Sequence, residues 1–257
     1  MQKKKSDIPN KFTGTYYNKD YFQTPKGKKF QRPNGTIDAW SYASPDGESK
    51  VFKYILEAWN KMFQPKTMLD VGCGRGTVVT YARDINIEAF GFDFSEWAVN
   101  DEGRYKRCKK EWLKCHDATT PWPYPDNSFD LTVALDLFEH IYLDDIPFVV
   151  SELFRVSKKW IFLQIATVNV VDHLGSLGRK AEPGYILKKG EPVSIEREGN
   201  AVAGHVTVTN RTAWEEWIDH DDWIIRRDLV NLFTTYMGKY MNKNWLLNTM
   251  LIYEKME

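Results

Sequence analysis

Three glycines lie close together in a stretch whose residue types could bind a nucleotide. Gly72, Gly74 and Gly76 occur within "LDVGCGRG", between an apolar run and a run with helical spacing. Glycine permits positive φ angles and lets a ligand approach the bare backbone at the carboxyl end of a strand. The third glycine comes one residue earlier than in the G-x-G-x-x-G turn of dinucleotide-binding proteins, and no G-K-[ST] follows as in a phosphate-binding loop. The spacing therefore disfavours a dinucleotide and a nucleoside triphosphate.

Two carboxylates further along the chain narrow the choice of ligand. Asp93 comes 21 residues after Gly72 and ends the second expected strand, where it could accept hydrogen bonds from both hydroxyls of a ribose. Asp117 ends the third expected strand and could accept a bond from the exocyclic amine of adenine. A carboxylate at a strand end can also simply cap the next helix. A ligand with a ribose, an adenine and no phosphate satisfies all three features, and S-adenosylmethionine is such a ligand.

Alternating strands and helices would place these residues at one edge of a sheet. Apolar runs predict five strands, and amphipathic spacing predicts helices between them, which is typical of a parallel sheet covered on both faces. The strands are expected at 67–71, 87–93, 112–117, 129–136 and 158–166, and the intervening helices at 48–63, 75–84, 96–108 and 144–157. Later residues predict a helix at 211–220 and two strands at 222–229 and 245–255.

Four stretches together resemble successive motifs of the class I S-adenosylmethionine-dependent methyltransferases, nearest to the subgroup called methyltransferase type 11. They are "LDVGCGRG", "GFDFS", "HDATTPWPYPDNSFDLTVALDLFEHI" and "ELFRVSKKWIFLQI". The resemblance implies a Rossmann-like, doubly wound α/β fold with a seven-stranded sheet whose last strand is antiparallel. We expect an N-terminal arm at 1–47, a methyltransferase domain at 48–257, and an insertion after strand five, at 168–204, that shapes the acceptor site.

The resemblance also implies roles for the residues of the glycine turn. Asp70, in the first strand, would orient the turn and the amine of the bound methionine. The backbone around Gly72 and Gly74 would pass beneath the cofactor. Cys73 would lie in the same turn, where we interpret it as a small filler.

Residues at the ends of the later strands would hold the rest of the cofactor. Asp93 would bind the ribose, and Phe94 would pack on the adenine. Asp117 would read the adenine edge together with the backbone amide of Ala118. Leu135, at the end of the fourth strand, would present its carbonyl oxygen to the methionyl ammonium.

The aromatic arm leaves two interpretations open. Tyr17 and Tyr21, with Tyr16 and Phe22, could close over the sulfonium, since aromatic faces attract cations. They could equally pin the arm to the domain.

Histidines are the candidate general bases. A hydroxyl acceptor needs a base or a metal, whereas a neutral amine needs little more than positioning. His140 follows the fourth strand within "LFEHI", and a structural role for it and for Glu139 is favoured over catalysis. His205 follows the insertion and could face the transferred methyl, or could satisfy backbone groups in a loop. His173, within the insertion, is a weaker candidate.

Composition limits the partners and the location. Lys plus Arg and Asp plus Glu both number 35, so no net charge attracts a nucleic acid. No apolar segment approaches the roughly 20 residues that cross a bilayer, and "KKK" near the start is followed by polar residues instead of a signal-peptide core. Three cysteines without metal-ligand spacing are typical of reduced thiols, so we expect a cytoplasmic protein and no metal site.

The acceptor is predicted only as a class. No [DNS]-P-P-[YFW] element follows the fourth strand, where "ALDLFEH" stands, and no Pro-Cys nucleophile occurs there. A small-molecule hydroxyl or amine acceptor is therefore favoured. A protein or RNA acceptor, and a module that binds the cofactor without transferring its methyl group, remain as alternatives, and the sequence does not predict the oligomeric state.

Overall fold

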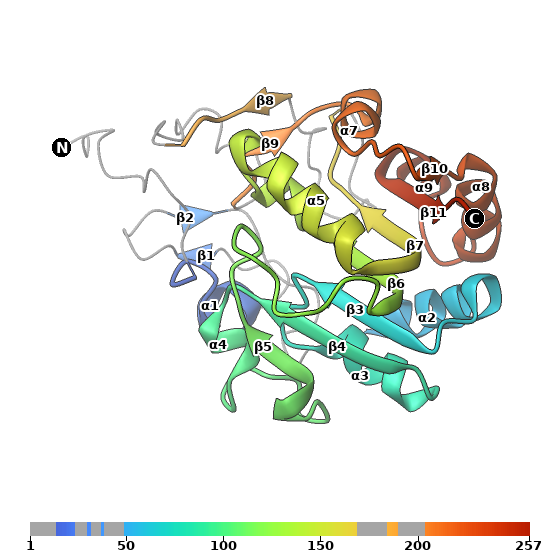
Figure 1. The fold of residues 1–257 in the computed structure, drawn as a ribbon. Helices are drawn as coiled ribbons and strands as arrows, with labels where there is room; N and C mark the ends of the chain where they lie inside the picture. Colours follow the sequence, from blue (N-terminus) through green and yellow to red (C-terminus); the bar gives the residue numbers. More distant parts are fainter. Residues whose placement is uncertain (1–13, 24–29, 32–36, 39–48, 169–183, 190–203) are drawn as a thin grey trace.

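A seven-stranded sheet forms the centre of the computed structural model (Figure 1). The structure describes residues 14–23, 30–31, 37–38, 49–168, 184–189 and 204–257. In sheet order the strands are β10 (Trp223–Ile225), β11 (Met250–Lys255), β7 (Ser157–Gln164), β6 (Phe129–Leu135), β3 (Thr67–Val71), β4 (Glu88–Asp93) and β5 (Leu113–Cys115).

The strand directions are those of the predicted fold. β3 pairs in parallel with both β4 and β6, β4 with β5, and β6 with β7. The last strand, β11, runs antiparallel to β7 and to β10. β3 is the first strand of this sheet along the chain and lies between β4 and β6, and the later strands add on both sides of it, so the doubly wound sheet with an antiparallel last strand is confirmed.

Helices cover both faces of the sheet and enclose two apolar cores. On one face lie α2 (Lys50–Phe63), α3 (Thr77–Asp84), α8 (Arg227–Met237) and α9 (Lys243–Thr249), and on the other lie α5 (Ile146–Val156) and α7 (Arg211–Trp217). Helix α2 shows why these segments fold locally. Ser49 caps its first turn by accepting a bond from the Phe52 amide at 3.5 Å. Ile55, Trp59 and Phe63 recur every four residues and are buried on one face.

The predicted helix at 96–108 is wrong in length. Only α4 (Glu96–Val99) forms, capped by the Ser95 hydroxyl, which accepts a bond from the Ala98 amide at 3.0 Å. The Asn100 side chain then accepts bonds from the amides of Glu102 and Gly103. This local turn competes with the helix and ends it.

The two strands predicted near the C-terminus are also shorter than expected. β10 ends at Ile225 and α8 begins at Arg227, so most of 222–229 is not strand. The expected strand at 245–255 begins as α9, because the Asn242 side chain caps that helix through the Trp245 amide at 3.1 Å. The aromatic segment between the two strands thus forms helices that cover the sheet.

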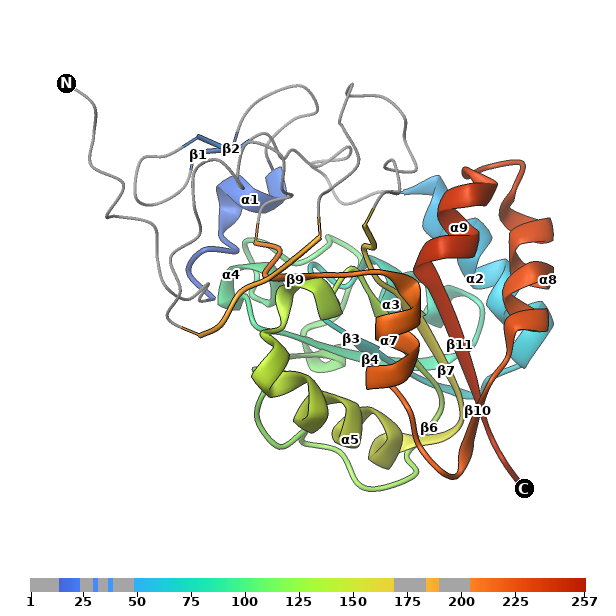
Figure 2. The same ribbon diagram turned by 90° about the horizontal axis from the view of Figure 1, so that it is seen from above.

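The described part of the arm packs beside the described part of the insertion. Helix α1 (Lys19–Gln23) lies near α4, and β8 (Tyr185–Ile186) pairs antiparallel with β9 (Thr207–Val208). Figure 2 shows α1, α4 and β9 on the same side of the molecule. A third apolar cluster joins them; it contains Tyr16, Tyr21, Phe22, Ala98, Tyr142, Tyr185, Leu187, Val206 and Val208.

Most of the predicted arm and insertion falls outside the described residues. Of the arm, the structure also gives the antiparallel pair β1 (Phe30–Gln31) and β2 (Ile37–Asp38). Val168, 184–189 and Gly204 are the described parts of the insertion, and His173 is not among them. The domain boundaries stay a prediction. None of the helices in the described ranges is long and apolar enough to span a membrane.

Candidate active site

The glycine turn joins β3 to α3 in a conformation that favours glycine. Gly72, Gly74 and Gly76 have φ angles of 73°, 50° and 76°, which side chains rarely tolerate. The amides of Gly72 and Cys73 donate to the Phe92 carbonyl at 2.9 and 3.0 Å, which fixes the turn to the end of β4. The turn is therefore rigid and leaves its backbone bare at the carboxyl edge of the sheet.

Asp93 ties the turn to the next strand. One carboxylate oxygen accepts a bond from the Gly74 amide at 2.7 Å, and the other accepts one from the Ser95 amide at 2.8 Å. Burial raises the pKa of Asp93, and these two bonds oppose that rise. Each oxygen keeps a second lone pair, so the carboxylate can still accept bonds from ribose hydroxyls.

Replacing Asp93 by alanine should weaken S-adenosylmethionine binding by about 1–3 kcal/mol, because the ribose bonds are lost. Calorimetric titration measures the change. Asp93→Asn, which keeps one acceptor oxygen, should lose less. Equal affinity in the wild type and Asp93→Ala would remove the ribose-binding role.

Asp70 is the strongest sign that the site takes a cationic ligand. Its side chain is 3% exposed, and no described residue donates a hydrogen bond to its carboxylate. Burial, and secondarily the charge of Asp93, raise its pKa well above the usual range. An ammonium group beside it would supply the missing donor and charge. The residues present therefore fit the amine of S-adenosylmethionine.

Cofactor binding should strengthen as pH rises. Asp70 has a raised pKa without ligand, and a nearby ammonium favours its ionised form, so binding below that pKa must release a proton. Affinity should increase up to that pKa and then level off. Calorimetry in buffers of different ionisation enthalpy reads the proton release, which Asp70→Asn should abolish. A proton count that is the same in both proteins would contradict the assignment.

The other predicted cofactor residues lie along the same edge. Phe94 follows β4, and a Cβ on Gly14 would lie 2.5 Å from the Phe94 carbonyl oxygen, so the arm passes directly over it. β5 ends at Cys115, two residues before Asp117. Asp117 caps its own loop by accepting bonds from the amide and hydroxyl of Thr119.

Ala118 and Leu135 complete this set. Ala118 is buried, and its carbonyl accepts a bond from the Trp122 indole at 2.9 Å. Leu135 ends β6 opposite Gln164 of β7. The cofactor contacts of these residues stay predictions.

The arm lies over the glycine turn. The Ser95 hydroxyl donates to the Tyr17 carbonyl, which fastens the arm to the start of α4. The rings of Tyr17 and Tyr21 meet edge to face with centroids 5.0 Å apart. Phe22 approaches the turn, since a Cβ on Gly74 would lie 3.4 Å from its ring. The arm thus both packs on the domain and covers the turn.

Two histidines far apart in the sequence meet beside this arm. His140 ends the short helix η2 (Phe138–His140), and its ring lies edge to face with the ring of His205, with centroids 4.8 Å apart. The Tyr17 hydroxyl lies 3.2 Å from His140 Nδ1. His205 Nε2 lies 3.9 Å from Glu139 Oε1. The structure therefore brings both predicted base candidates into one cluster with the arm.

Backbone contacts place His205 there. The Val206 amide donates to the Glu139 carbonyl at 2.8 Å, and the Thr207 hydroxyl donates to the Ile141 carbonyl at 2.7 Å. Gly204 has a φ of 83°, and a Cβ on it would lie 2.8 Å from the Tyr17 hydroxyl. The glycine of "GHVTV" is thus the sequence signal for this close approach.

Burial sets the protonation of the cluster. Burial, and secondarily repulsion from His205, lower the pKa of His140 to about 3. Burial raises the pKa of Glu139 to about 8, with Asp136 adding to the rise and His205 opposing it. At neutral pH His140 is therefore a neutral imidazole, and Glu139 keeps its proton to a higher pH than an exposed carboxyl.

The cysteines do not contribute a charge to the site. Cys73, Cys108 and Cys115 are free thiols, of which only Cys115 is exposed. Burial raises the pKa of Cys73 well above its usual range. A Cβ on Gly91 would lie 2.7 Å from the Cys73 Cβ, so this side chain fills the space under the turn.

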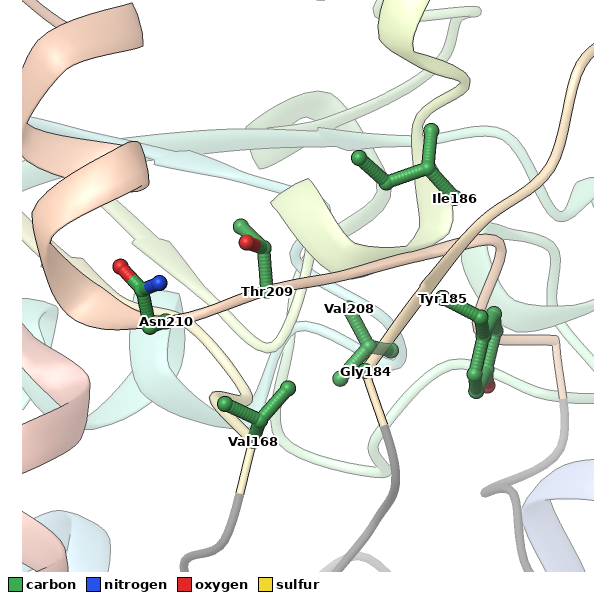
Figure 3. Close-up of a pocket in the computed structure, with 7 residues that line it drawn as sticks. All are labelled: Val168, Gly184, Tyr185, Ile186, Val208, Thr209 and Asn210. Atoms are coloured by element: carbon green, nitrogen blue, oxygen red, sulfur yellow. The ribbon is translucent and has the colours of Figure 1, made fainter.

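A separate hollow lies beside β8 and β9 (Figure 3). It has a volume of about 410 Å³ and is lined by Val168, Gly184, Tyr185, Ile186, Val208, Thr209 and Asn210. The glycine turn does not line it. It is linked to the histidine cluster through Tyr185, whose hydroxyl donates to the His205 carbonyl at 3.4 Å.

Comparisons with known proteins indicate a methyltransferase domain, which is consistent with a site for S-adenosylmethionine at the glycine turn. Residues 69–160 match the family model described as a methyltransferase domain. The chain is 28% identical over 149 residues to O-methyltransferase 3 of Dictyostelium discoideum, covering 53% of this chain and 34% of that protein. It is 30% identical over 115 residues to ajmaline N-methyltransferase of Rauvolfia serpentina, covering 43% and 37% respectively. The chain thus spans about a third of the length of these curated relatives.

A solved structure shows the same fold over most of the chain. The plantazolicin methyltransferase BpumL in complex with SAH matches with a TM-score of 0.51 and 15% identity, covering 82% of this chain and 87% of that one. Residues 69–160 therefore carry a domain of the class I S-adenosylmethionine-dependent methyltransferase type. The family's cofactor is S-adenosylmethionine, and Asp70, the glycine turn and Asp93 are the residues of this chain that fit it.

Proposed function

We propose that this methyltransferase moves the methyl group of S-adenosylmethionine to an oxygen or nitrogen atom of a small-molecule acceptor by in-line displacement. The observation that carries the proposal is the cluster of Tyr17, Glu139, His140 and His205 beside the glycine turn. When bound, the cofactor supplies an electrophilic methyl group on a sulfonium.

The chain's own residues would then position the acceptor and exclude water. Phe22 covers the turn from the arm and Tyr17 contacts His140, and exclusion of water strengthens electrostatic interactions inside the site. His205, with His140 beside it, would remove a proton from the acceptor. Asp93 and Asp70 would hold the two ends of the cofactor.

Two features support a small acceptor. The matched relatives in Dictyostelium discoideum and Rauvolfia serpentina are named as an O-methyltransferase and an ajmaline N-methyltransferase. The hollow beside β8 and β9 is lined partly by Val168 and residues 184–186 of the expected insertion, which supports a role of the insertion in shaping the acceptor site.

A labelling experiment tests the function. The protein is incubated with methyl-labelled S-adenosylmethionine and a cell extract, and the label is followed in small-molecule, protein and RNA fractions. We expect label in the small-molecule fraction that survives protease and ribonuclease treatment. Label in protein or RNA would overturn the acceptor class, and cofactor binding without any labelled product would indicate a non-catalytic module. A cytoplasmic location and the absence of a nucleic-acid partner stay predictions.

A further inference from the structure

Glu139 is a buried acid that cofactor binding does not explain. Its side chain is 0% exposed. Oε1 accepts a bond from the Ala166 amide at 3.1 Å, while Oε2 has no hydrogen-bond partner among the described residues. A carboxylate in such surroundings is costly unless it holds a proton or faces a cation.

His205 is the side chain that can supply the positive charge. Its Nε2 lies 3.9 Å from Glu139 Oε1, and its side chain is 5% exposed. The bond between the Val206 amide and the Glu139 carbonyl holds the two residues side by side. The separation exceeds a hydrogen bond, but such contacts in ligand-free sites often tighten when substrate binds. The fold thus builds a carboxyl–imidazole pair away from water.

We propose that Glu139 and His205 form a proton-accepting pair and that the methylated acceptor is a hydroxyl compound; this rests on the proposed function. His205 takes the proton of the hydroxyl while the oxygen forms a bond to the methyl carbon. The carbon–sulfur bond breaks, its electron pair stays on sulfur, and S-adenosylhomocysteine leaves. Glu139 is a positioning residue, which orients His205 and stabilises the imidazolium that forms.

The acceptor class follows from what the pair provides. A neutral amine already carries the lone pair that attacks and needs little help from a base, whereas a hydroxyl must lose its proton as the new bond forms. A buried acid beside a buried imidazole costs folding free energy. That cost has a function only if the site must take up a proton.

The groups around the pair set the pH at which it works. Asp136, which follows β6, faces Glu139, and its charge adds to burial in raising the pKa of Glu139 to about 8. His140 faces His205, and Tyr17 faces His140 from the arm. His140 stays neutral at working pH, and Glu139 loses its proton as pH rises through about 8. The ionised form of Glu139, which can stabilise an imidazolium on His205, therefore increases as pH rises through that value.

Nuclear magnetic resonance of the histidine rings tests the pair without requiring turnover. The imidazole carbons of ¹³C-histidine-labelled protein with S-adenosylhomocysteine are followed against pH in the wild type and in Glu139→Gln. Glutamine keeps an oxygen for the Ala166 amide, so the structural contact survives. We expect a step near pH 8 in the His205 signal of the wild type. In Glu139→Gln this step should vanish, because the glutamine amide does not titrate in this range.

Identical His205 titrations in the two proteins would overturn the pair. If Glu139→Gln does not fold, the wild type decides alone, because a His205 signal without a step near pH 8 has the same meaning. The product then tests the acceptor class: a methyl carbon bonded to oxygen supports it, and one bonded to nitrogen overturns it. Failure of the proposed function is distinguishable, since it appears as no calorimetric heat with S-adenosylhomocysteine or no labelled product.

Discussion

Replacing His205 by alanine is expected to slow methyl transfer by about 10²–10⁴-fold, which is the usual contribution of a general base. The affinity for S-adenosylhomocysteine should stay unchanged, because the residues that fit the cofactor, Asp70 and Asp93, lie on β3 and at the end of β4. Single-turnover rates with the acceptor found by labelling, together with calorimetry, measure the two quantities separately.

A second histidine provides the matched control. His220 is exposed and packs on Phe154, with ring centroids 4.8 Å apart, outside the cluster that contains His205. His220→Ala should therefore transfer methyl groups at the wild-type rate. A near-normal rate in His205→Ala would rule out His205 as the base, and equal losses in both variants would point to a general loss of structure.

The sequence predicts the central strands well because they are largely buried on both faces of the sheet. "TMLDV" is a short apolar run bounded by a proline and by the glycine turn, and it forms β3 over the predicted residues. The carboxylates Asp70 and Asp93 could be placed for the same reason, since each lies at or near the end of such a run. Continuous apolar runs of this kind are typical of parallel sheets covered on both sides.

The elements that were predicted wrongly depend on single polar side chains. Asn100 ends α4 and Asn242 begins α9, and in both cases one amide side chain binds nearby backbone amides. Hydrophobic periodicity alone does not reveal where a helix starts or stops when such a cap decides it. An asparagine three residues before Trp245 was the available signal.

The histidine cluster could not be derived from spacing. His140 and His205 are 65 residues apart, and the segment between them includes the expected insertion. Their meeting depends on hydrogen bonds from the Val206 amide and the Thr207 hydroxyl to backbone carbonyls in and after η2. The proposed role of Glu139 could not be predicted either, because the sequence shows that an acid is present but not that it is buried beside the imidazole of His205.

Truncating Trp59 to alanine should lower the free energy of unfolding by about 3–5 kcal/mol, the usual cost of removing a large buried ring. Trp59 on α2 is 0% exposed, and its ring meets Phe162 of β7 with centroids 4.9 Å apart. Denaturant unfolding measures the loss, and the melting temperature should fall by about 2–4 °C for each kcal/mol in a chain of this size.

Trp59→Phe separates the packing of the ring from its polar atom. The indole N–H of Trp59 has no hydrogen-bond partner among the described residues, so phenylalanine removes a buried unpaired donor while keeping an aromatic contact with Phe162. Its cost should therefore be clearly smaller than that of alanine, and equal losses would show that the indole N–H is bonded in solution. Trp59 packs between α2 and the face of the sheet, away from the glycine turn. Trp59→Ala should therefore bind S-adenosylhomocysteine normally at temperatures where it stays folded. Weaker binding in the folded variant would mean that this core also supports the glycine turn.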